Sequence, residues 1–218
     1  KSVISRLFLL IFGFILMRDA MTPMGLWQFG VYNSTVWFRF IDDGLILFVL
    51  ALTSLAVTLG ILYLNKRLNS YLKWFGKNKI ISLTVGLLGA ISVITPFLMM
   101  YMNMPIEQRG GIVPADLLIP LFVFALFGNF MEEVLFRGYI QGYYETKTGP
   151  WRAAMISGLL FAAGHIFLSA TVADLGAIIL LFTLYEGLIC AIVRMKHGII
   201  ASTLTHSLTI FVLASGLV

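Results

Sequence analysis

Residues 44–65, GLILFVLALTSLAVTLGILYLN, contain no charged side chain and are long enough to cross a bilayer as one helix, which takes about 20 apolar residues. Over all 218 residues, 60% are hydrophobic and only 11% are charged, which is about half the charged fraction of an ordinary globular domain. This composition excludes a disordered chain and almost any soluble enzyme. The single cysteine, Cys190, excludes an internal disulfide and argues against a zinc–thiolate site. We therefore expect an integral membrane protein.

Other apolar runs predict the remaining spans. Uncharged runs of similar length occur at 80–106, 153–173 and 198–218, and runs interrupted by charges occur at 110–145 and 175–193. A shorter run, 7–17, spans only if Arg6 and Arg18 extend to the two membrane faces. The segment 20–38 mixes tryptophans with Pro, Gln and Asn, which is typical of an interfacial loop. The sequence thus predicts an all-α, polytopic transmembrane helical bundle of about seven spans, or six if the first run lies on the surface.

The basic residues predict how the bundle is oriented. Eleven of them lie in segments that share one side of the membrane: Lys1, Arg6, Lys66, Arg67, Lys73, Lys77, Lys79, Lys147, Arg152, Arg194 and Lys196. Three others, Arg18, Arg39 and Arg109, lie on the opposite side. Because short cytoplasmic loops carry the excess of Lys and Arg, we expect the N-terminus in the cytoplasm, and the short loops favour a bacterial plasma membrane. The net charge of +5 is then explained by the basic residues that orient the chain in the membrane, and we expect no nucleic-acid partner.

Six ionisable side chains lie inside the predicted spans, where they are costly and are functional candidates by default. They are Glu132, Glu133, Arg137, His165, Glu186 and His206. Glu133 and Arg137 are four residues apart and can pair on one helix face. Glu132 is rotated by about 100° from that face and has no local partner.

Helix geometry predicts that these residues share one depth. With a rise of about 1.5 Å per residue, Glu132 and His165 both lie roughly 20 Å from the expected cytoplasmic turn at 145–152. His206 lies near the same layer, and Glu186 is at most one turn shallower. We therefore expect a site formed by four helices that opens toward the cytoplasmic half of the membrane.

A carboxylate beside a neutral imidazole can hold and deprotonate a water, either directly or through a bound metal. A second imidazole can donate to a developing oxyanion. Together these groups indicate hydrolysis of an amide or ester inside the membrane. The sequence contains no H-E-x-x-H zinc motif and no G-x-S-x-G serine elbow, which excludes two other designs.

The motifs resemble those of a known family. Glu132, Glu133 and Arg137 resemble the E-E-x-x-x-R motif of the CAAX-protease and bacteriocin-processing (Abi) intramembrane endopeptidases, and Phe161 and His165 resemble its F-x-x-x-H motif. His206 stands where the third motif begins. The resemblance implies that Glu132 and His165 activate water, that Arg137 holds Glu133, and that His206 stabilises the oxyanion near the cytoplasmic face. On this basis we divide the chain into N-terminal transmembrane helices with a basic loop, residues 1–109, and a catalytic helical core, residues 110–218.

The resemblance leaves the role of metal open. Family members have been described both as metalloproteases and as glutamate-dependent enzymes without metal. If a divalent metal such as zinc is present, Glu132, His165 and His206 are the expected ligands. The partners implied are the lipid bilayer and a peptide or membrane-protein substrate.

One position departs from the family pattern. Ile210 stands four residues after His206, where the third motif usually has Asn or Asp, and an isoleucine cannot donate to an oxyanion. Asn129, on the same helix side as Glu132, is a candidate replacement, and a helix–helix hydrogen bond is its other interpretation. For Glu186, a structural partnership with Arg137 is favoured slightly over a catalytic role.

Two alternatives to an enzyme follow from these residues. Ile210 favours a catalytically weak or inactive membrane partner of the same fold, acting in bacteriocin immunity or cell-envelope regulation. A small transporter would use Glu186 and the histidines as a proton relay, but the paired broken helices typical of transporters are missing from the sequence.

Overall fold

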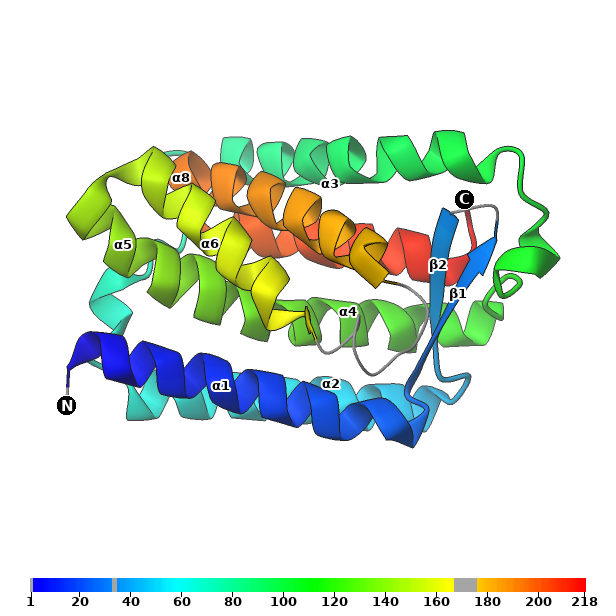
Figure 1. Ribbon diagram of the computed structural model, residues 1–218, viewed down its shortest axis with the longest axis horizontal. Coiled ribbons are helices and arrows are strands. Elements are labelled where there is room, and N and C mark those ends of the chain that lie inside the picture. Colours follow the sequence, from blue (N-terminus) through cyan, green and yellow to red (C-terminus); the bar gives the residue numbers. More distant parts are fainter. Residues whose placement is uncertain (1, 33–34, 167–175) are drawn as a thin grey trace.

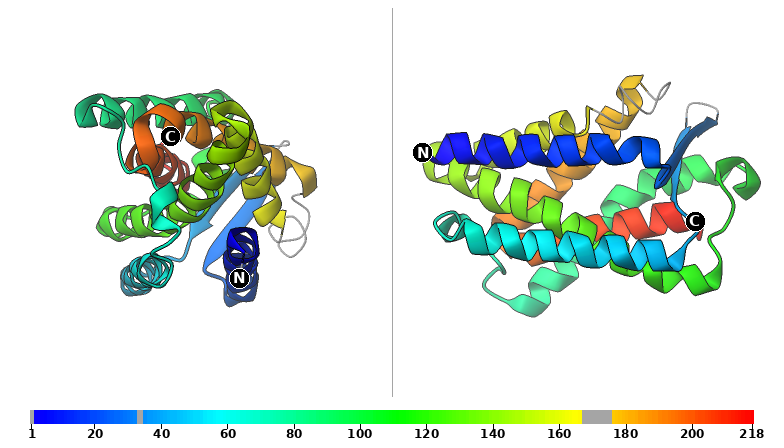
Figure 2. Two further views of the ribbon diagram at one scale, coloured as in Figure 1. Left: turned by 90° about the vertical axis from the view of Figure 1, so that its left-hand side faces the viewer. Right: turned by 90° about the horizontal axis from the view of Figure 1, so that it is seen from below.

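The computed structural model describes residues 2–32, 35–166 and 176–218, which form an elongated bundle with helices running roughly along its long axis (Figure 1). The helices are α1 (Val3–Met21), α2 (Gly44–Leu64), α3 (Lys79–Tyr101), α4 (Leu118–Glu133), α5 (Gln141–Thr148), α6 (Pro150–Gly164) and α8 (Gly176–Ser215). Short 3₁₀ turns are η1 (Thr22–Met24), η2 (Asn69–Tyr71), η3 (Ile106–Arg109) and η4 (Ala115–Leu117), and η5 (Val134–Ile140) is a π-helix. The N-terminus and the α5–α6 turn lie at one end, and a β-hairpin and the C-terminus lie at the other (Figures 1 and 2). We call these the basic end and the hairpin end.

Local sequence explains where the helices begin. Ser2, Asp43 and Asn78 are N-caps whose side-chain oxygens accept the backbone N–H three residues later. The outer face of α2 exposes leucines such as Leu45 and Leu52, as expected of a surface that meets lipid rather than water.

The bundle is a helical membrane fold, but the expected seven spans are not supported. Four helices in the described part of the chain are long and apolar enough to cross a membrane: Gly44–Leu64, Lys79–Tyr101, Ala115–Thr148 and Ala177–Ser215. Helix α1 carries Arg6, Arg18 and Asp19, and α6, the described helix of the run 153–173, has only 15 residues. The two runs expected at 175–193 and 198–218 correspond to two helical halves, labelled together as α8, which meet at Gly198.

The chain of α8 reverses between these halves at Gly198, where φ is +83°. Ser202 Oγ donates to the carbonyl of Cys190 across the reversal, at 3.0 Å, and the two halves of α8 run side by side (Figure 1). A Cβ at Gly198 would lie 2.6 Å from the carbonyl oxygen of Trp74. Glycine at this position therefore allows both the positive φ of the turn and the close approach of the Trp74 backbone.

Small residues allow α3 to pack closely on the second half of α8. Thr205 Oγ1 donates to the carbonyl of Gly86 at 2.9 Å, and a Cβ at Gly86 would lie 2.7 Å from the carbonyl oxygen of Ala201. Close contact through glycine and threonine is the usual way in which helices associate in a bilayer.

The segment 20–38 is not simply the interfacial loop that we expected, because it contributes to an antiparallel hairpin of β1 (Trp27–Tyr32) and β2 (Thr35–Phe40). Trp27 is paired with Phe40, and Phe29 with Phe38. Aromatic and β-branched residues at alternate positions favour strands, and here that pattern prevails over the polar residues that suggested a loop.

Candidate active site

The first motif lies where α4 passes into η5. Glu132 and Glu133 end α4, and the π-helical turn that follows contains Arg137 and is buried throughout. The Ser157 hydroxyl donates to the carbonyl of Phe136 inside this turn, at 2.9 Å. π-Helical turns are rare and occur frequently at functional sites.

Glu133 is the centre of a buried polar network. Its Oε1 lies 3.0 Å from Arg137 Nη1, as their four-residue spacing predicts, and 2.9 Å from His206 Nδ1. Ser202 Oγ donates to Oε2 of the same carboxylate. Arg137 also donates to the carbonyl of Gly187 at 3.0 Å. The side chains of Glu133 and Arg137 are 0% exposed, so this network ties the first motif to both halves of α8 and has no contact with solvent.

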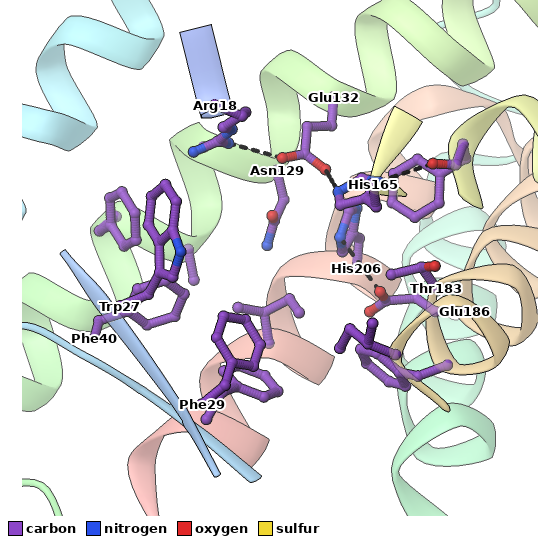
Figure 3. A pocket seen from close by; sticks show the side chains of 18 residues that line it. Arg18, Trp27, Phe29, Phe40, Asn129, Glu132, His165, Thr183, Glu186 and His206 are labelled. Atoms are coloured by element: carbon purple, nitrogen blue, oxygen red, sulfur yellow. Dashed lines mark hydrogen bonds and ion pairs between the residues drawn. The ribbon is translucent and has the colours of Figure 1, made fainter. Parts of the chain in front are cut away.

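Glu132 points elsewhere and meets two groups from other helices. Arg18 of α1 donates from Nη2 to Oε1 at 2.7 Å, and His165 Nε2 lies 3.5 Å from Oε2 (Figure 3). His165 Nδ1 lies 2.8 Å from the carbonyl oxygen of Phe161, which can only accept a hydrogen bond. Nδ1 therefore carries a proton, and in the neutral tautomer Nε2 is an acceptor that faces the carboxylate. In that tautomer the two atoms can share a proton donor such as water.

Three contacts differ from the sequence expectation or were missed by it. Arg18 does not extend to the membrane face but turns into the site. Glu186 Oε2 lies 3.6 Å from His206 Nε2, whereas Arg137 uses the Gly187 carbonyl in place of the Glu186 carboxylate. No local motif marks Arg18, because its partner lies 114 residues away in sequence.

These side chains line one end of a cavity of about 110 Å³. Its walls continue through Phe124 and Gly128 of α4, Phe182 of α8 and Ile210, together with aromatic rings of the hairpin. The cavity extends from these polar residues toward the aromatic rings of the hairpin (Figure 3), and the expected opening toward the cytoplasmic half stays a prediction. Depth along a helix does not determine from which side its side chains are reached.

Several polar atoms that line the cavity lack hydrogen-bond partners within the described ranges. They include Asn129 Nδ2 and Glu186 Oε1, both in side chains that are almost completely buried. Asn129 therefore makes no helix–helix hydrogen bond through that atom. Buried polar atoms are nearly always paired, so an unpaired donor and an unpaired acceptor in one cavity are typical of a binding site.

The described residues do not fit a catalytic zinc ion. Such an ion takes three protein ligands and one open position. Glu132, His165 and His206 do not form a group in which all ligand atoms are close together, whereas Glu133, Cys190 and His206 lie within 4.8 Å of one another. The carboxylate of Glu133 is already bound by Arg137, His206 and Ser202, so this second group is a structural network.

Comparison with known proteins supports the motif assignment. Residues 114–212, just under half of the chain, match the family model described as type II CAAX prenyl endopeptidase Rce1-like. The match confirms the resemblance seen in the motifs. No curated protein and no solved structure showed a significant match. Arg18 and the hairpin lie outside the matched segment.

Proposed function

We propose, from the match of residues 114–212 to the CAAX prenyl endopeptidases, that this chain is an intramembrane endopeptidase in which Glu132 and His165 activate the attacking water. The observation that carries the proposal is the proximity of Glu132 Oε2 and His165 Nε2, 3.5 Å apart at the polar end of the cavity.

The reaction begins with a water that donates hydrogen bonds to these two atoms. Glu132 takes one proton as the water oxygen attacks the carbonyl carbon of the peptide bond, and the π electrons of that carbonyl move to its oxygen. The tetrahedral intermediate then collapses and the C–N bond breaks. The proton on Glu132 passes to the leaving amine, so Glu132 returns to its carboxylate form and the products are an acid and an amine. Arg18 keeps the carboxylate in place by holding Oε1.

The oxyanion needs donors, and the apolar side chain of Ile210 provides none. Asn129 Nδ2 is an unpaired donor on the same helix as Glu132 and is our candidate. His206 supplies a second donor when its Nε2 carries a proton, while Nδ1 stays bonded to Glu133. Glu186 orients His206 in this scheme and touches no reacting atom.

We place the basic end in the cytoplasm of a bacterial cell, because short cytoplasmic loops carry the excess of Lys and Arg. With that orientation, the cavity is reached from the extracytoplasmic half of the membrane. Peptides added to right-side-out vesicles would then be cleaved, whereas cleavage only in inverted vesicles would contradict the orientation.

The test of the proposed chemistry is a cleavage assay with purified protein and a mixture of synthetic peptides, in which products are identified by mass spectrometry. Glu132→Gln and His165→Ala should abolish cleavage without loss of folded protein. Glu107→Gln is the matched control, because Glu107 is exposed and lies outside the cavity, and it should cleave at the wild-type rate. Full activity in either site variant would refute the mechanism.

A catalytically inactive membrane partner of the same fold is the second candidate, favoured by the presence of Ile210 in the cavity wall. Complementation of a deletion strain separates the two functions. A scaffold tolerates Glu132→Gln, whereas an enzyme does not.

A further inference from the structure

We propose that the β-hairpin forms a substrate-binding subsite, in which Trp27 Nε1 donates to a backbone carbonyl beside the scissile bond and the surrounding rings bind a large apolar side chain. The inference rests on the proposed peptide hydrolysis and specifies the class of residue next to the cut. It concerns residues outside the segment 114–212 that the family model matches.

Strand alternation sets which side chains face the cavity. Trp27 is directly opposite Phe40 in the hairpin, Phe29 is directly opposite Phe38, and all four line the cavity. The rings of Phe29 and Phe38 lie 5.8 Å apart, centroid to centroid. Because successive residues of a strand point to opposite faces, these two cross-strand pairs form one aromatic wall.

The other face of the hairpin is used for packing. Arg39, between Phe38 and Phe40, donates from Nη1 to the carbonyl of Leu213 at 3.0 Å and from Nη2 to that of Gly111 at 2.8 Å. These bonds attach the hairpin to the C-terminal end of α8 and to the segment that follows η3. The aromatic wall is thus held by the fold and does not depend on a ligand for its position.

Trp27 provides the observation that points to a ligand. Its side chain is buried, with 9% of the residue exposed, and Nε1 has no hydrogen-bond partner within residues 2–32, 35–166 and 176–218. The indole nitrogen is turned into the cavity (Figure 3). Asn129 Nδ2 is unpaired in the same cavity. An indole N–H is a donor only, so acceptors of a bound molecule would satisfy both atoms.

A peptide is the occupant that satisfies both the donors and the rings. Its backbone carbonyls are acceptors, and its apolar side chain can pack between aromatic rings. A lipid acyl chain would fill the aromatic part but leave both donors unpaired. A charged ligand would lose its hydration against apolar walls without gaining a counter-charge there.

The experiment compares Trp27→Phe, which keeps an aromatic ring and removes the N–H, with Trp37→Phe. Trp37 is the matched control because it lies on β2 of the same hairpin and does not line the cavity. The probes are synthetic dodecapeptides that differ only at one position beside the cut, with Gly, Ala, Leu or Phe. We expect Trp27→Phe to raise KM about tenfold with little change in kcat, and Trp37→Phe to stay within about twofold of wild type.

Side-chain preference gives a second, independent readout. Wild type should cleave the Leu and Phe peptides at least about tenfold better than the Gly peptide, as the burial of a large apolar side chain requires. Phe29→Ala should reduce that preference, because it removes part of the aromatic wall. If Trp27→Phe does not fold, this variant still tests the subsite.

Peptide binding to Glu132→Gln protein separates the inference from the proposed function. If wild type cleaves but Trp27→Phe and Phe29→Ala match wild type in KM and preference, the subsite is refuted and the protease assignment stands. If peptides bind, depend on Trp27 and are never cleaved, the subsite stands and the protease assignment fails. If peptides neither bind nor are cleaved, both are refuted.

Discussion

Replacing Glu133 with Gln should destabilise the protein strongly, whereas the same replacement at Glu132 should leave it folded and inactive. Glu133 and its partner Arg137 are both 0% exposed, and Glu133 also binds His206 and Ser202. Without the carboxylate, the guanidinium of Arg137 stays buried with no counter-charge. Glu132 is different, because its partner Arg18 lines the cavity and its side chain is 11% exposed.

The magnitude follows from the burial of the pair. Removing one partner of a buried ion pair costs about 3–5 kcal/mol in the free energy of unfolding. For a chain of this size, each kcal/mol lowers the melting temperature by about 2–4 °C, so Glu133→Gln should melt roughly 6–20 °C below wild type. Glu132→Gln should cost less, because its amide oxygen can still accept from Arg18, whose side chain lines the cavity, and should therefore melt closer to wild type than Glu133→Gln.

Thermal unfolding of the purified proteins in one detergent, followed by tryptophan fluorescence, measures the difference. The double variant Glu133→Gln/Arg137→Met should recover part of the loss, because it removes the uncompensated charge together with its partner. Equal melting temperatures for the two single variants, or no recovery in the double variant, would refute the assignment of Glu133 to a structural network.

Three further predictions concern other parts of the structure. Arg18→Gln should lower kcat at least about tenfold with little change in KM, because Glu132 Oε1 is no longer held. Arg18→Lys should restore part of this rate. Unchanged turnover of Arg18→Gln in steady-state assays would show that Arg18 does not position the base. Gly86→Ala should cost about 1–3 kcal/mol in thermal melts, because its Cβ would lie 2.7 Å from the Ala201 carbonyl oxygen, whereas Gly60→Ala has open space and should cost nothing. Treatment with 1,10-phenanthroline should leave peptide cleavage unchanged, and a loss of cleavage that added zinc reverses would contradict the ligand geometry.

Much of the candidate site could be predicted from the sequence, because charges in apolar runs are few and helix geometry is regular. Residue counts from the turn at 145–152 place Glu132 and His165 at equal depth, and their side chains are 3.5 Å apart in the structure. Glu133 and Arg137 pair through the four-residue spacing alone. Both predictions use only the rise and period of a helix.

The remaining features depend on contacts between distant segments. In the sequence, Arg18 is indistinguishable from an ordinary charged residue at the end of a short apolar run. Only tertiary packing brings it to Glu132. The hairpin was missed because polar residues and a proline concealed the alternation of Trp27 and Phe29. The direction of the cavity could not be predicted either, because its walls come from the hairpin and several separate helical segments.

The position of the cavity at the hairpin end has a consequence for when cleavage takes place. With the basic end in the cytoplasm, as we propose, a polypeptide would have to expose the residues beside its cut on the far side of the membrane before Glu132 could act on it. Under the proposed function, processing would then be coupled to secretion, and a protein retained in the cytosol would stay intact.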